Sequence, residues 1–125
     1  MAMNWKIKKD MVNDAAEKIK SYGYRVFVFT DDKDGTCYGY FSDDKYVGYF
    51  QSDWNAYSVS MYGAPGVEVI DGFRDQETTI TKEICERATS GKVPMWAMRE
   101  SPFPILFKLD ELLNIYNTDD RFKEI

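Results

Sequence analysis

Two side chains suited to anchoring a ligand or a partner lie near the middle of the chain. The neighbouring residues do not show whether either one has a purely structural role. The first is Trp54, which occupies a predicted turn between Asp53 and Asn55, where a large aromatic has little local role. Exposed aromatic side chains are typical anchors of binding surfaces. The alternative is that Trp54 folds back and caps the sheet, and the sequence leaves both interpretations open.

The second is Arg74, the only basic residue between Lys45 and Lys82. It can pair with the neighbouring acids Asp71 and Asp75, or it can offer its planar fork to a carboxylate or phosphate of a ligand. The sequence does not decide between these two roles.

A strand predicted over 56–62 adds an aromatic ring and hydroxyl groups. Its alternation places Tyr57 on one face, and Ser58 and Ser60 on the other. A ring for stacking, hydroxyls and an arginine fork would suit a nucleotide-type ligand. We therefore predict ligand or partner binding at six residues: Asp53, Trp54, Tyr57, Ser58, Ser60 and Arg74.

The chain has few side chains suited to catalysis, because its 125 residues include no histidine. This removes the Ser-His-Asp triad, the Cys-His pair and the commonest metal ligand. The adjacent acid pairs at 43–44 and 119–120 lie in predicted turns, where neighbouring carboxylates do not converge on one substrate atom. We expect a protein that is not an enzyme, with no catalytic residue and no cofactor.

The acidic stretch before Gly35 resembles a calcium loop only superficially. With Gly35 at the sixth position of an EF-hand, Thr30 and Phe41 occupy the first and twelfth positions, which need carboxylates. The stretch therefore predicts a hairpin turn and no metal site. The two cysteines, Cys37 and Cys85, are expected to be small buried apolar side chains rather than nucleophiles.

The net charge of the chain indicates which classes of partner it can bind. The formal net charge is -5, and this acid excess opposes binding to nucleic acid, which needs lysine and arginine to neutralise phosphates. The predicted strands also bring together tyrosines that either pave a base-stacking face or form core beneath the helices. These tyrosines are Tyr38, Tyr40, Tyr46, Tyr49, Tyr57 and Tyr62.

These groups would be positioned by one α+β domain spanning residues 1–125. Hydrophobic periodicity and turn residues predict an N-terminal helix, an antiparallel sheet of four or five strands, and two C-terminal helices packed on the sheet. The predicted helices cover 5–22, 79–88 and 109–116, and the predicted strands cover 24–30, 36–41, 46–51 and 56–62, with 67–70 as a short fifth strand. The polar tail after Asn117 is expected to fray.

The N-terminal residues lack the apolar core of a signal peptide, and no apolar run is long enough to span a membrane. With two unpaired cysteines, this favours the cytosol. Met1 and Ala2 are either native or the remnant of cloning.

The stretch from Tyr46 to Trp54 resembles a family of small phage and mobile-element proteins. In that family a GY-hydrophobic-Q strand precedes a serine-rich strand, a proline-containing loop and a G-F-R strand. Here these correspond to 48–51, Ser58 to Ser60, Pro65 and 72–74, followed by Pro94-Met95-Trp96 and the K-L-D-E-L-L stretch at 108–113. The family's loop carries a His and a Lys that Met61 to Pro65 lacks, so any role of those residues is absent here.

The resemblance implies an accessory protein acting against host defences in the host cytosol. We therefore expect a non-enzymatic inhibitor that binds a host protein. The alternative is a protein that binds and sequesters a small nucleotide-type signal molecule. Either mode is compatible with a homodimer, and neither needs a membrane.

Overall fold

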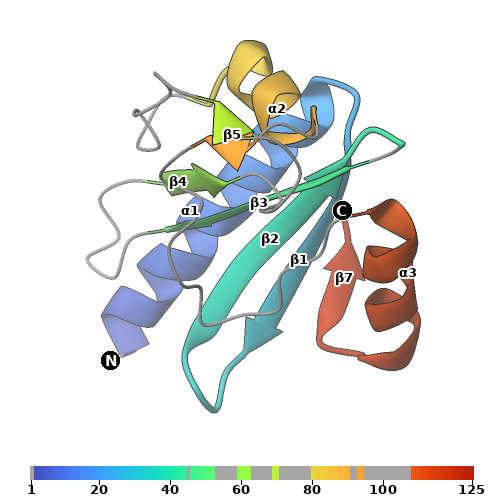
Figure 1. Ribbon diagram of the computed structural model, residues 1–125. Helices are drawn as coiled ribbons and strands as arrows, with labels where there is room; N and C mark the ends of the chain where they lie inside the picture. Colours follow the sequence, from blue (N-terminus) through green and yellow to red (C-terminus); the bar gives the residue numbers. More distant parts are fainter. Residues whose placement is uncertain are drawn as a thin grey trace.

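The fold is described from a computed structural model that covers residues 2–44, 46–52, 59–62, 69–70, 80–90, 93–94 and 108–125 (Figure 1). Helix α1 (Ala2–Ser21) precedes four strands, β1 (Arg25–Asp31), β2 (Thr36–Ser42), β3 (Val47–Ser52) and β4 (Val59–Tyr62). Then follow β5 (Val69–Ile70), α2 (Lys82–Ala88), β6 (Val93–Pro94), α3 (Leu109–Thr118) and β7 (Phe122–Glu124). The described elements confirm the α+β class and an N-terminal helix before an antiparallel sheet.

Helix α1 forms because its apolar residues recur at helical spacing. Its buried stripe consists of Val12, Ala15, Ala16 and Ile19. The helix ends where Gly23 adopts a φ of 101°, and the Gly23 N–H donates to the Lys20 carbonyl at 2.9 Å. A glycine in this left-handed conformation is a common way for a helix to end.

The central sheet has the strand order β4-β3-β2-β1-β7, and each neighbouring pair is antiparallel. The first four strands form the predicted meander. The turn between β1 and β2 is the predicted hairpin, with Gly35 at a φ of 67°.

Two predictions about strands were wrong. Val69–Ile70 does not join the central sheet, but pairs in parallel with Val93–Pro94 in a separate two-stranded sheet. The central sheet takes its fifth strand from the tail that was expected to fray. Phe122 is buried there, and the Ile125 N–H donates to the Val26 carbonyl at 2.9 Å, so the tail is fixed by apolar burial and by backbone pairing.

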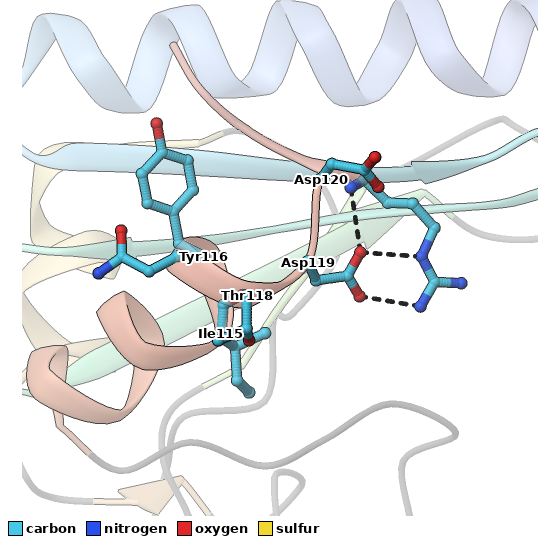
Figure 2. Close-up of a pocket in the computed structure, with 7 residues that line it drawn as sticks. Ile115, Tyr116, Thr118, Asp119 and Asp120 are labelled. Atoms are coloured by element: carbon cyan, nitrogen blue, oxygen red, sulfur yellow. Dashed lines mark hydrogen bonds and ion pairs between the residues drawn. The ribbon is translucent and has the colours of Figure 1, made fainter.

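Helices lie on both faces of the sheet. Helices α1 and α2 pack on the face of Val26, Val28, Phe41 and Phe50. Helix α3 packs through Leu112 on the opposite face, which is almost entirely aromatic. Figure 2 shows these layers edge-on, with α1 above the strands and α3 below them.

The helix boundaries differ slightly from the predicted ones. Helix α2 begins at Lys82 rather than at 79, because the Thr81 side chain caps it by accepting a hydrogen bond from the Ile84 N–H at 3.2 Å. Helix α3 starts at Leu109 as predicted and continues to Thr118.

Candidate functional site

Most residues predicted to bind a ligand or partner lie outside the described residues: Asp53, Trp54, Tyr57, Ser58 and Arg74. Of the six, only Ser60 falls within a described strand, where its backbone in β4 lies opposite Gln51 of β3. The structure therefore neither assembles this group nor separates it. These six assignments stay predictions.

The tyrosines of β2 and β3 are core and not an open stacking face. Tyr38, Tyr40 and Tyr49 are buried in the cluster that packs against Leu112 of α3. Burial raises the pKa of the Tyr38 hydroxyl to about 12 and that of Tyr40 higher still. Of the two roles that the sequence left open for these tyrosines, the three buried ones take the structural role.

Both cysteines are buried, as predicted. Cys37 lies beneath α1 with its Sγ 4.0 Å from Thr30 Oγ1, and Cys85 is fully enclosed in the same apolar cluster. Burial raises the pKa of the Cys37 thiol, and it raises that of Cys85 to about 12. Because the thiolate is the reactive form, neither side chain is prepared for nucleophilic chemistry.

At one end of the sheet, Arg121 joins the end of β1 to the turn that leads from α3 into β7. Arg121 donates to Asp31 at 2.9 Å and, through two nitrogens, to Asp119 at 2.8 and 3.0 Å. Its guanidinium lies 4.8 Å from the ring centre of Phe29. Hydrogen bonds from Arg121 hold the pKa values of the Asp31 and Asp119 carboxyls below their ordinary range. Asp119 therefore acts in the turn and not as half of a catalytic pair with Asp120.

Helix α1 holds the other side of the β1–β2 turn. Trp5 Nε1 donates to Asp32 at 3.0 Å, and the Lys9 ammonium lies 3.6 Å from the same carboxylate. The acids of the turn thus neutralise cations of this chain. No set of three metal-binding side chains occurs in the part of the chain that the structure describes.

We expect the ion pairs of Arg121 to stabilise the fold at neutral pH and to lose this effect in acid. Because the folded pKa values of Asp31 and Asp119 are lowered, their contribution is fully present above about pH 4 and is lost as pH falls through those lower values. Urea unfolding of the wild type and of Arg121→Gln should therefore show a stability difference that shrinks below about pH 4.

The control for this experiment is Lys6→Gln, which removes an exposed ion pair between Lys6 and Asp10 within α1. Such pairs contribute little, so this variant should match the wild type. A difference for Arg121→Gln that stays constant from neutral pH into acid would contradict the assignment.

One groove of the described surface, of about 460 Å³, lies between α1 and β7. Val28 and Thr30 line it from β1, Lys9 and Asn13 from α1, and Lys123 from β7. The remaining lining residues are Asp32, Asp120, Arg121 and Ile125. Most of the lining side chains are polar or charged, and only Val28 and Ile125 are apolar.

A second depression, of about 760 Å³, is formed by the end of α3 and the turn into β7, from Ile115 to Arg121 (Figure 2). In this view Tyr116 points toward the strands, in agreement with its ring lying 5.0 Å from that of Phe27. Asp119 is engaged by the dashed bonds to Arg121. Because Asp119 and Arg121 of this depression bond each other, the groove between α1 and β7 is the better candidate site.

Strand β7 borders the groove and is an edge of the sheet. The Thr30 N–H donates to the Arg121 carbonyl at 3.2 Å, and Ile125 bonds Val26. Because bonding residues alternate along an antiparallel strand, Lys123, opposite Val28, also turns its backbone toward β1. Phe122 and Glu124 turn theirs away from the sheet. The chain thus presents backbone donors and acceptors beside the groove.

Sequence reasoning missed this edge. The only signal was one apolar residue followed by two charged ones, from Phe122 to Glu124, and this stretch is too short to distinguish a strand from a polar tail. The pairing partner, β1, is distant in sequence, so local patterns cannot reveal it.

Comparisons with models of protein families, with curated proteins and with solved structures found no match to this chain. The phage-type resemblance of the sequence thus stays a prediction. Within the described residues, no helix combines the length and apolar character needed to cross a membrane. The geometry of the described residues is therefore the main support for a functional proposal.

Proposed function

We propose that this chain is a non-enzymatic accessory protein that acts by binding a partner protein in the host cytosol. The observation that carries the proposal is the outer edge of β7, with which no described strand pairs, beside the groove that Lys9, Asn13 and Lys123 line. Edge strands recognise extended segments of other proteins through their backbone groups. An anti-defence role rests on the phage-type resemblance alone.

The reactive side chains on described elements support binding over catalysis. Both thiols are buried with raised pKa values. Asp31 and Asp119 are engaged by Arg121, while Asp43 and Asp44 are exposed in a turn. Carboxylates that are exposed to solvent or engaged in ion pairs lack the enclosed setting that acid–base catalysis needs.

Native mass spectrometry tests the proposal. The protein would be isolated from cells in which it acts, and compared with the same protein after denaturation and refolding. We expect a retained polypeptide that is lost on refolding and is restored when the purified partner is added back. Hydrogen exchange on the restored complex should then show where protection appears.

Two outcomes would count against the proposal. A small retained mass without a polypeptide would favour the alternative, sequestration of a nucleotide-type molecule at the predicted residues around Trp54 and Arg74. Turnover of any substrate by the purified protein would contradict the non-enzymatic assignment.

A further inference from the structure

We propose that the outer edge of β7 binds an extended acidic segment of the partner as a sixth strand of the central sheet. The segment would run along Phe122, Lys123 and Glu124 and place a carboxylate opposite Lys123. This inference rests on the proposed function and names the chemistry of the partner.

The backbone of β7 is suited to strand addition. Glu124 has both its N–H and its carbonyl directed outward, and Phe122 has its carbonyl directed outward. The Phe122 N–H bonds the Asp119 carbonyl at 3.2 Å, so the edge that no described strand pairs with starts after this turn. The three residues after Phe122 also have exposed side chains: Lys123, Glu124 and Ile125.

Charge selects an acidic segment. Lys123 is exposed and forms no ion pair among the residues that the structure describes, and the same holds for Lys20 on α1. Arg25, with Lys20 nearby, holds the pKa of the Glu124 carboxyl below its ordinary range, so this acid is already neutralised by the chain itself. The side chain that lies directly opposite Lys123 on an added strand therefore meets an uncompensated positive charge.

The position of that charge favours close contact. In an added antiparallel strand, the residue facing Lys123 forms a non-hydrogen-bonded pair, in which side chains approach most closely. That residue would lie on the α1 face of the sheet, beside the groove that Lys9 and Asn13 line. Asp120 also lines this groove, so the partner's carboxylate is expected opposite Lys123 and not beside Asp120.

A second copy of this chain is a poor occupant of the edge. If Phe122 pairs with Glu124 of a second copy, Lys123 lies opposite the second copy's Lys123. This register sets two lysines directly opposite, each without an ion pair among the described residues, which destabilises strand pairing.

Proline substitution tests the backbone component. Glu124→Pro removes an outward N–H and leaves the bonds to β1 intact, and an edge strand tolerates proline at such a position. The matched control is Glu124→Ala, which also loses the ion pair to Arg25 but keeps the N–H. The probe is a yeast-displayed library of short peptides in which β-branched residues alternate with randomised positions.

We expect the wild type to enrich peptides with aspartate or glutamate at a randomised position. For the tightest of them, Glu124→Pro should weaken binding about tenfold relative to Glu124→Ala. Selection on Lys123→Glu should enrich lysine or arginine at the same position, because the charge has been reversed. This second variant does not alter the backbone, so it tests the proposal even if the proline variant unfolds.

Equal binding by Glu124→Pro and Glu124→Ala would overturn the edge as the site. Enrichment of the same acidic peptides by Lys123→Glu, or of no acidic peptide by the wild type, would overturn the charge selection. A concentration-dependent dimer that Glu124→Pro abolishes would show that the edge serves self-association instead. In all of these cases, a polypeptide retained in native mass spectrometry would still support partner binding through another surface.

Discussion

Replacing Gly39 with alanine is expected to lower the free energy of unfolding by about 2 kcal/mol. Gly39 of β2 lies opposite Phe50 of β3, and the Phe50 ring covers the position that a β-carbon would fill. Phe50 is fully buried beneath α1, so its ring cannot swing out to make room. Chemical or thermal unfolding, followed by circular dichroism, measures the loss.

The sign of this effect is decided by comparing two terms. Alanine restricts the unfolded chain more than glycine does, which stabilises the fold by about 0.4–1 kcal/mol where the native φ is compatible. Gly39 is not among the described glycines with positive φ, so this gain applies. Overpacking a rigid core costs about 1–3 kcal/mol, and a direct overlap with a buried ring falls toward the upper end. The steric term therefore exceeds the entropic gain.

A compensating substitution distinguishes steric overlap from a general weakening of the strand. Phe50→Leu removes the outer ring atoms that a β-carbon at residue 39 would meet. We expect the double variant to lose less free energy of unfolding than the two single variants lose together, by at least about 1 kcal/mol. Additive losses would contradict the overlap and would place the cost of Gly39→Ala in the strand backbone.

A second glycine–phenylalanine pair lies nearby in the same two strands, with the glycine on β3 and the phenylalanine on β2. Gly48 of β3 lies opposite Phe41 of β2, and a β-carbon there would stand 2.5 Å from Cζ of Phe41. Each phenylalanine ring thus fills the space that the glycine across from it leaves open. This reciprocal packing fixes the register of β2 and β3, because a slip by one residue would separate each phenylalanine ring from the glycine that makes room for it.

The sequence predicted the elements that local patterns determine. The helical spacing of Val12, Ala15 and Ile19, and the turn at Gly35, are short-range signals, and both were confirmed. Short-range signals could not show that β7, and not Val69–Ile70, is the fifth strand of the central sheet. This depends on pairing between residues about a hundred positions apart, such as Phe27 and Glu124.

The candidate site followed the same division. Sequence reasoning selected side chains with evident chemistry, such as Trp54 and Arg74, which lie outside the described residues. The site that the structure favours consists largely of backbone groups on β7, and every residue offers those groups. Only the strand order shows which of them have no partner strand among the described elements. Residue types could have indicated Lys123 as a cation, but not as a cation at an open edge.

Replacing Leu112 with alanine is expected to lower the free energy of unfolding by about 3 kcal/mol. Leu112 is the fully buried residue of α3, and it packs on the aromatic face formed by residues such as Phe27, Tyr40 and Tyr49. Its loss leaves a cavity between rings that cannot collapse together. Because α3 leads directly into β7, loosening the helix should also increase hydrogen exchange at the edge strand.

The control is Asn114→Ala, which changes an exposed residue of the same helix and preserves its backbone. Its stability should lie within about 0.5 kcal/mol of the wild type. Near-ultraviolet circular dichroism adds a direct probe of the tyrosines, and the tyrosine signal should weaken for Leu112→Ala before global unfolding. If both variants keep the wild-type stability and tyrosine signal, α3 does not hold the aromatic face closed. That face would then be a second surface to which a partner could bind.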